Sequence, residues 1–239
     1  MSVATTAAEA ASEQAIVVLS GGQDSTTCLY WAIDRFGQDA VRCLTFDYGQ
    51  RHRIELRCAS AIAEQAGVPQ ETLPINTFAA LGGSSLLDAD QKIETSSGDE
   101  LPATFVPGRN LVFLTFAAAY AWQHGARHLV TGVAQTDYSG YPDCREPAIA
   151  ALAEALQLGM EMSLTIHTPL MHLSKADTVR LADRVGAMDA MRLTHTCYNG
   201  ERPPCGACDA CELRARGFAE AGVVDPLVDE AGTLVGNSL

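Results

Sequence analysis

The chain has 239 residues, of which 47 % are hydrophobic and 19 % are charged, and its formal net charge is −13. This composition is typical of a well-buried globular core and excludes a disordered chain. The acidic balance disfavours a protein that grips a nucleic-acid backbone, because phosphate contacts need a basic face. Residues 1–14 contain neither Lys nor Arg and no apolar signal region, so we expect a disordered tail, no membrane span and a cytoplasmic protein.

Apolar runs alternate with helical periodicity along the chain. The predicted strands are residues 15–19, 41–46, 71–75, 128–132 and 163–167, and the predicted helices are residues 26–36, 53–66, 109–124, 146–159 and 175–185. This alternation predicts an α/β fold with a doubly wound, mainly parallel sheet and helices on both faces. Polar side chains follow several predicted strands, so we expect a site beyond the carboxyl ends of the sheet.

The chain is expected to divide into one α/β domain at residues 15–190, a small cysteine-rich region at residues 191–221 and a tail at residues 222–239. A short helix is expected at about residues 212–221. The loop-rich stretch at residues 76–107 has two interpretations, a mobile lid or a variable surface insertion.

The sequence SGGQDS at residues 20–25 lies between the first predicted strand and the first predicted helix. A strand, a glycine turn and a helix together point backbone N–H groups at a phosphate. The loop lacks the lysine and the spacing of a Walker A loop, so it does not predict a γ-phosphate clamp. The alternative is an ordinary turn in which glycine supplies a positive φ and Asp24 or Ser25 caps the helix.

Four cysteines are clustered near the C-terminus with the spacing C-x7-C-x2-C-x2-C: Cys197, Cys205, Cys208 and Cys211. Four soft thiolates suit one tetrahedral zinc ion in a closed, structural site. A redox pair, an iron–sulfur cluster and simple buried thiols are the competing interpretations. His195 is either a spare ligand or a residue that packs beside the cluster.

Three further positions are candidates for a site. Arg109 opens the most apolar predicted helix, where an anion is favoured; the alternative is a solvent-exposed arginine. The segment 137–145 gathers acidic, aromatic and basic residues in a turn after a strand, which suits either a heterocycle site or a surface Asx turn. Ser174 is expected to cap the helix that Lys175 opens, and lysine at that end favours a nearby phosphate.

These segments together closely resemble the 7-cyano-7-deazaguanine synthases, the queuosine-pathway family of the PP-loop ATP pyrophosphatases. The resemblance covers about residues 15–218 in order. Its matching pieces are residues 20–28, 45–52, 105–110, 132–145, 169–171, 175–177 and 197–200, the remaining clustered cysteines, and residues 213–214.

The resemblance implies a PP-loop fold and an ATP-dependent ligase that converts 7-carboxy-7-deazaguanine and ammonia into the nitrile through an adenylate and an amide. It also implies Mg²⁺ with ATP, small-molecule substrates without direct nucleic-acid binding, and a homodimer. The implied ATP-binding residues are Leu19, Ser20, Gly21, Gly22, Gln23, Asp24, Ser25, Thr26 and Thr27. The implied substrate-binding residues are Asp47, Gln50, Arg51, Arg109, Asp137, Tyr138, Asp143 and Arg145, and the implied catalytic residues are Asp24, Lys175 and Arg109.

Three alternatives stay open at this point. Ammonia-dependent NAD and GMP synthetases share the glycine loop but are not expected to carry the four cysteines. A PP-loop tRNA-thiolating enzyme would use cysteines for sulfur transfer or an iron–sulfur cluster, and the acidic balance speaks against it. A zinc-stabilised nucleotide-binding module without turnover is the third alternative.

Overall fold

The computed structural model describes residues 13–50, 53–81, 84, 104–135, 140–228 and 233. Its centre is a five-stranded parallel sheet in the order β3-β2-β1-β4-β5. The strands are β1 (Ala15–Val18), β2 (Val41–Asp47), β3 (Gln70–Pro74), β4 (His128–Val130) and β5 (Thr165–His167). All five predicted strands are therefore confirmed, together with their parallel arrangement.

The strand order reverses beside β1. Val17 pairs with Cys43 of β2 on one side and with Val130 of β4 on the other. The chain builds β1, β2 and β3 in one direction and then crosses back to place β4 next to β1. The carboxyl ends of β1 and β4 therefore diverge at a topological switch point, where ligands bind in open parallel sheets.

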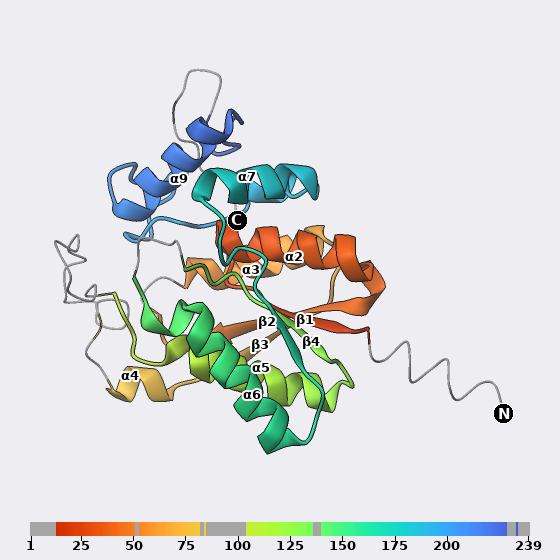
Figure 1. Cartoon of the computed structure of the whole chain (residues 1–239). Helices are drawn as coiled ribbons and strands as arrows, with labels where there is room; N and C mark the ends of the chain where they lie inside the picture. The colour runs from red at the N-terminus through yellow and green to blue at the C-terminus, as the bar shows by residue number, and fades with distance from the viewer. Residues whose placement is uncertain are drawn as a thin grey trace.

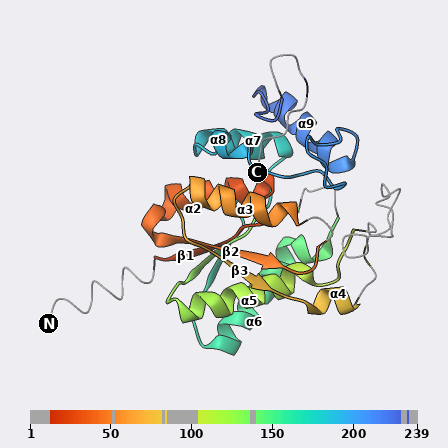
Figure 2. The same ribbon diagram turned by 180° about the vertical axis from the view of Figure 1, so that it is seen from behind.

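Helices cover both faces of the sheet, as predicted (Figure 1). One face carries α2 (Gln23–Phe36) and α3 (Ile54–Gln65); the opposite face carries α5 (Arg109–Gln123) and α6 (Glu146–Met160), with α4 (Thr77–Leu81) near its edge. Figure 2 shows the same separation from behind. Single turns of 3-10 helix occur at η1 (Gln38–Ala40) and η2 (Pro142–Cys144). No helix in the described part of the chain has the length and apolarity to cross a bilayer.

A third layer lies on the outer side of α2 and contains α7 (Lys175–Arg184), α8 (Met188–Met191) and α9 (Asp209–Ala221) (Figures 1 and 2). Buried side chains from all three helices and the α7–α8 turn form a small core of their own: Val179, Ala182, Ala187, Met191 and Phe218. Gly217 lets α9 approach α7 closely, because a Cβ added there would lie 3.0 Å from the Cβ of Lys175.

Alternation along β1 divides the main core between the two faces. Ile16 packs in the cluster that faces α5 and α6, whereas Ala15, Val17 and Leu19 pack in the cluster that faces α2 and α3. Successive side chains of a strand point to opposite faces, so a continuous apolar run is buried on both sides.

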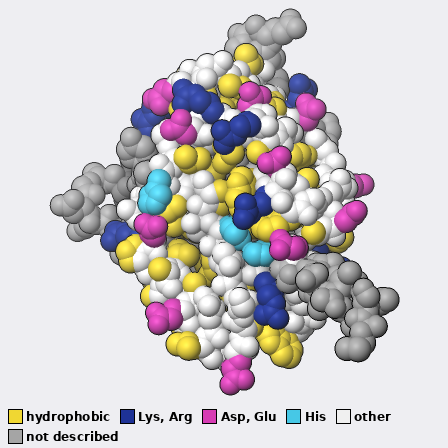
Figure 3. All heavy atoms as spheres, turned by 45° about the vertical axis from the view of Figure 1, so that its right-hand side comes forward, with side chains coloured by type: hydrophobic (Ala, Val, Ile, Leu, Met, Phe, Trp, Pro, Cys, Tyr) yellow, Lys and Arg dark blue, Asp and Glu magenta, His cyan; other side chains and the backbone are white. Residues whose placement is uncertain are grey.

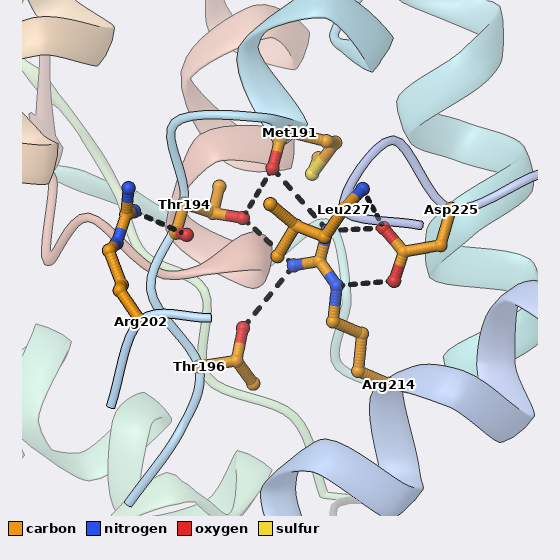
Figure 4. Close-up of polar contacts among 7 residues, drawn as sticks. All are labelled: Met191, Thr194, Thr196, Arg202, Arg214, Asp225 and Leu227. Carbon is orange, nitrogen blue, oxygen red and sulfur yellow. Dashed lines mark hydrogen bonds and ion pairs between the residues drawn. The ribbon is translucent and has the colours of Figure 1, made fainter. Parts of the chain in front are cut away.

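A buried ion pair joins α9 of the cysteine-rich region to the segment that follows this helix (Figure 4). Arg214 of α9 binds both carboxylate oxygens of Asp225, at 2.7 and 2.8 Å, and donates to the Thr194 hydroxyl at 2.8 Å. Both charged side chains are nearly inaccessible to solvent, at 3 % and 7 % exposed. The bidentate pair fixes α9 against the segment that follows it, and the hydrogen bond to Thr194 fixes α9 against the segment that precedes the cysteines.

Candidate active site

Residues 20–25, which we call the PP-loop, connect β1 to α2 and contain one glycine that no other residue replaces without strain. Gly21 has a φ of +85°, and a Cβ there would lie 2.4 Å from the Glu55 carbonyl oxygen and 2.9 Å from the Ala59 nitrogen. Glycine is thus required both for the backbone angle and for the contact with α3. The backbone of His195 holds the other side by donating to the Gly21 carbonyl at 2.9 Å.

Gly22 is the N-cap of α2, so the helix begins at Gln23, three residues before the predicted start. Asp24 and Ser25 therefore lie in the first turn of the helix. The hydroxyls of Ser25 and Thr26 donate to the Gly22 carbonyl at 3.1 and 2.8 Å. These hydroxyls hold the loop shape, while the first N–H groups of a helix have no partner within the helix and favour an anion.

Asp24 and Lys175 connect the PP-loop to α7. Lys175 Nζ lies 2.7 Å from Asp24 Oδ2, with the two side chains 22 % and 24 % exposed. The other carboxylate oxygen, Asp24 Oδ1, is buried and has no hydrogen-bond partner among the described residues. Ser174 caps α7 as predicted, accepting from the Asp177 backbone at 3.1 Å, and so brings Lys175 to the loop.

A cavity of about 300 Å³ opens at the switch point, between the PP-loop and α5. Gly132, which follows β4, lets the end of β4 lie close to the PP-loop, because a Cβ at this position would lie 3.1 Å from the backbone of Asp24 and Ser25. The cavity walls include Ser20, Asp24 and Ser25 of the PP-loop. A second cavity of about 320 Å³ shares Asp24 and is lined by Lys175, His172 and Arg216, among others.

Among the described residues that line the first cavity, Arg109 is the cation. It opens α5, and its Nη1 donates to the Tyr48 hydroxyl at 3.3 Å. The guanidinium also lies over the rings of Tyr48 and Tyr141, at 5.6 and 5.9 Å from their centres. The aromatic rings orient the arginine, so Arg109 is a held group in the cavity and not a free surface residue.

The turn before α6 positions this arginine. Asp143 is buried and accepts from the Asn110 backbone at 2.9 Å, and Cys144 Sγ lies 3.3 Å from Asn110 Nδ2. The carboxylate thereby takes the place of an N-cap side chain for α5. Asp143 therefore fixes the end of α5 from which Arg109 enters the cavity.

The predicted substrate residues are distributed unevenly. Gln50 and Arg109 line the first cavity, whereas Asp47, Asp143 and Arg145 do not. Asp47 pairs with Arg53, and Arg145 donates to the Gly140 carbonyl. The remaining candidates lie outside the described residues: Arg51, Asp137 and Tyr138. The nucleotide candidates that line this cavity are Leu19, Ser20, Asp24 and Ser25. The candidates that do not line it belong to the same turn and the start of α2: Gly21, Gly22, Gln23, Thr26 and Thr27.

The four clustered cysteines come together as predicted. Their sulfur atoms all lie within 4.8 Å of one another, with Cys208 and Cys211 at 3.4 Å and Cys205 and Cys211 at 3.9 Å. Thiolates that bind zinc at about 2.3 Å stand roughly 3.8 Å apart in a tetrahedron, so this donor set fits such a metal. His195 donates no ligand to the cluster; its ring bonds the Cys197 carbonyl at 2.9 Å.

Several cavity residues escaped the sequence analysis. Glu55 enters from the first turn of α3, and Tyr198 enters from the loop that also carries Cys197. Burial raises the pKa of Glu55 to about 7, and the nearby Arg109 opposes that shift. From helical periodicity alone, Glu55 would be predicted to be an ordinary surface residue. Its place beside the cavity follows from the packing of α3 on Gly21, which is a tertiary contact.

The glycine loop at the switch point, with its cavity beyond the strand ends, defines a PP-loop-type nucleotide-binding α/β protein. A family model described as "Queuosine biosynthesis protein QueC" matches residues 14–222. The chain is 67 % identical over 223 residues to a 7-cyano-7-deazaguanine synthase of Chromobacterium violaceum, covering 92 % of this chain and 95 % of that relative. It is 64 % identical to the enzyme of that name from Laribacter hongkongensis, covering 91 % and 95 %. The chain belongs to the QueC family.

Among solved structures, the NMN synthetase of Francisella tularensis is similar, with a TM-score of 0.50 and 16 % identity. The match covers 92 % of this chain and 81 % of that chain. At this identity the likeness supports the shared fold alone.

Proposed function

We propose that this protein is an ATP-dependent ligase that converts 7-carboxy-7-deazaguanine and ammonia into 7-cyano-7-deazaguanine. The observation that carries the proposal is the PP-loop opening into a cavity in which Arg109 is the cation among the described residues, in a chain of the QueC family. A cavity of this kind suits a nucleotide beside a small anionic substrate.

A carboxylate needs activation before an amine attacks it, because its oxygen is a poor leaving group. In the proposed first step a carboxylate oxygen attacks the α-phosphorus of ATP, and pyrophosphate departs. The N–H groups at the start of α2 stabilise the charge on the pyrophosphate. Arg109 lies in the cavity and Arg145 does not line it, so the geometry favours Arg109 for orienting the carboxylate.

Pyrophosphate also needs positive charge on the side that faces away from the N–H groups of α2. Lys175 and Arg216 line the second cavity, which shares Asp24 with the first. We place the departing pyrophosphate between these two cavities, with Lys175 neutralising its charge. The buried, unpartnered Asp24 Oδ1 fits Mg²⁺, which prefers carboxylate oxygens and would supply further charge to the phosphates.

In the second step ammonia displaces AMP and leaves the amide. The amide oxygen then attacks a second ATP in the same way, and loss of AMP and of the remaining N–H protons leaves the nitrile. The same loop serves both activations, because each one transfers an adenylyl group to an oxygen of the same carbon. One cavity is therefore enough for the whole conversion.

The cysteine cluster supports a zinc ion with a structural role. Four thiolates fill all four positions of a tetrahedral site, so none is open for substrate. The metal would stiffen the loop that carries Tyr198 into the cavity. The proposed contribution of the metal to the reaction is therefore to hold Tyr198 in place at the cavity.

The substrates are proposed to be small molecules and not a polynucleotide. Acidic and basic side chains are interspersed over the face in Figure 3, and the net charge is −13. Phosphate backbones need a basic surface. A homodimer is supported by the exposed apolar side chains Phe116, Trp122 and Leu158 on α5 and α6.

The test is incubation of the purified protein with ATP, ammonia and 7-carboxy-7-deazaguanine, with mass spectrometry of the deazapurine. The proposal predicts the amide early and the nitrile late, each dependent on ATP. Omitting the carboxylate is the control for background nucleotide hydrolysis. Nucleotide turnover that is the same with and without the carboxylate would contradict the proposal.

A further inference from the structure

Within the described part of the chain, two carboxylates line the first cavity, the one between the PP-loop and α5: Asp24 and Glu55. They differ in their partners. Asp24 forms an ion pair with Lys175 at 2.7 Å. The Glu55 carboxylate has no hydrogen bond to another described residue, and Arg109 is the cation that acts on it electrostatically. Glu55 is therefore the cavity carboxylate that is available to a ligand.

The backbone places Glu55 against the phosphate loop. Its carbonyl oxygen occupies the space where a Cβ of Gly21 would lie, at 2.4 Å, so the first turn of α3 packs directly on the PP-loop. From there the side chain reaches the cavity that also holds Arg109. An adenylate formed at the PP-loop, with its acyl group toward Arg109, lies in the space that Glu55 borders.

The titratable groups around Glu55 come from three elements. Arg109 faces it from α5 and lowers its pKa, while Tyr48 after β2 and Cys58 on α3 are neighbours whose pKa values Glu55 raises. Burial is the main influence and raises the pKa of Glu55 to about 7. A carboxylate with such a pKa exchanges protons readily at neutral pH.

The proposed chemistry must dispose of protons on nitrogen. Ammonia that attacks the acyl-adenylate becomes a cationic nitrogen, which has to lose a proton for the C–N bond to persist while AMP leaves with the C–O bonding pair. The adenylated amide then loses two N–H protons as the second C–O bond breaks and the C≡N bond forms. Each step needs a base within reach of the reacting carbon.

We propose that Glu55 is the base that accepts these nitrogen-bound protons in amide and nitrile formation. The inference rests on the proposed function and goes beyond it by assigning the proton transfers to a residue outside the PP-loop. Glu55 is ionised when it receives the first proton and releases it to solvent before the next one. The transfers involve no oxidation, and the only other products are AMP and pyrophosphate.

The test compares Glu55→Gln with Glu64→Gln, an exposed glutamate on the same helix. Glutamine keeps the shape and hydrogen-bonding capacity of Glu55 but accepts no proton at neutral pH. Three rates are measured: carboxylate-dependent exchange of labelled pyrophosphate into ATP, amide formation with ammonium, and hydroxamate formation with hydroxylamine. The exchange reports adenylation alone, and hydroxylamine is a largely uncharged nucleophile at neutral pH.

We expect E55Q to keep its exchange rate within about threefold of the unmodified protein and to lose amide formation about 100-fold or more, the usual contribution of a general base. Hydroxamate formation is expected to fall much less than amide formation. With the synthetic amide as substrate, nitrile formation by the unmodified protein is expected to rise with pH through neutrality and to be slow and nearly pH-independent in E55Q. E64Q is expected to match the unmodified protein in every assay.

Two results would overturn the assignment. Equal losses of exchange and amide formation in a folded E55Q protein would mean that Glu55 binds substrate or shapes the loop, for example by reading the donor edge of the deazapurine. Unchanged amide formation would mean that another base acts. Absence of carboxylate-dependent exchange in the unmodified protein would instead overturn the proposed function itself, and the inference with it.

Discussion

Gly21→Ala tests whether the PP-loop is held against α3 as tightly as its shape requires. The added Cβ would meet two backbone atoms, the Glu55 carbonyl oxygen at 2.4 Å and the Ala59 nitrogen at 2.9 Å. Backbone atoms do not rotate away as a side chain does, so the loop or α3 must move. The residue also has a φ of +85°, which an alanine adopts only with strain.

These two effects have separate magnitudes. A positive φ costs an L-residue about 1–2 kcal/mol, and overpacking costs about 1–3 kcal/mol. We therefore expect G21A to lower the free energy of unfolding by about 2–5 kcal/mol. Gly222→Ala is the matched control, because Gly222 has a φ of +71° and, apart from its chain neighbours, no described residue has an atom within 4 Å of the added Cβ. The control is expected to lose only about 1–2 kcal/mol.

Urea unfolding measures both variants, and calorimetric titration with ATP measures the loop directly. Displacement of the loop is expected to weaken ATP binding in G21A by about tenfold or more, equivalent to ~1.4 kcal/mol, and to leave G222A unaffected. If the two variants lose the same stability and G21A binds ATP normally, the contact between the PP-loop and α3 does not constrain the site.

Three further predictions follow from the same contacts. Lys175→Met is expected to reduce kcat/KM for the carboxylate, measured in steady-state assays, by about 10²–10³-fold, because it removes one group that stabilises the developing charge. An unchanged kcat/KM would mean that Lys175 takes no part in the reaction. Arg214→Met leaves Asp225 buried and unpaired, so urea unfolding is expected to show a loss of about 3–5 kcal/mol, largely recovered by adding Asp225→Leu. Burial and His128 lower the pKa of His167 from 6.5 to about 4, so the unfolded chain takes up its proton first as the pH falls. The free energy of unfolding is therefore expected to fall between pH 6.5 and pH 4, and to fall less steeply in His167→Gln. Identical pH profiles for the variant and the unmodified protein would show that His167 does not cause the loss of stability.

The fold was predictable because its strands are buried on both faces. In β1, every residue from Ala15 to Val17 is fully buried, so the apolar run is visible without alternation. The short helices α4 and α8 escaped prediction, since five and four residues are too few to display helical periodicity. The start of α2 was placed three residues late, because Gly22 and not Ser25 is its N-cap.

The site was predictable where local sequence carries its chemistry. The PP-loop and the cysteine cluster each lie within a short segment, and the geometry of both follows from their spacing. Glu55 and Tyr198 reach the cavity only through tertiary packing, from elements far from β1 in the sequence. Asp143 resembles a substrate ligand in sequence, but its carboxylate caps α5, a contact between residues 33 positions apart.

The most direct measurement of the central claim follows the substrate oxygen. With 7-carboxy-7-deazaguanine labelled with oxygen-18 in its carboxylate, attack on the α-phosphorus transfers the label to AMP. The account predicts labelled AMP in step with the amide and the nitrile, detected by mass spectrometry. Label found in inorganic phosphate, or AMP formed without label, would contradict adenylation of the carboxylate at the PP-loop.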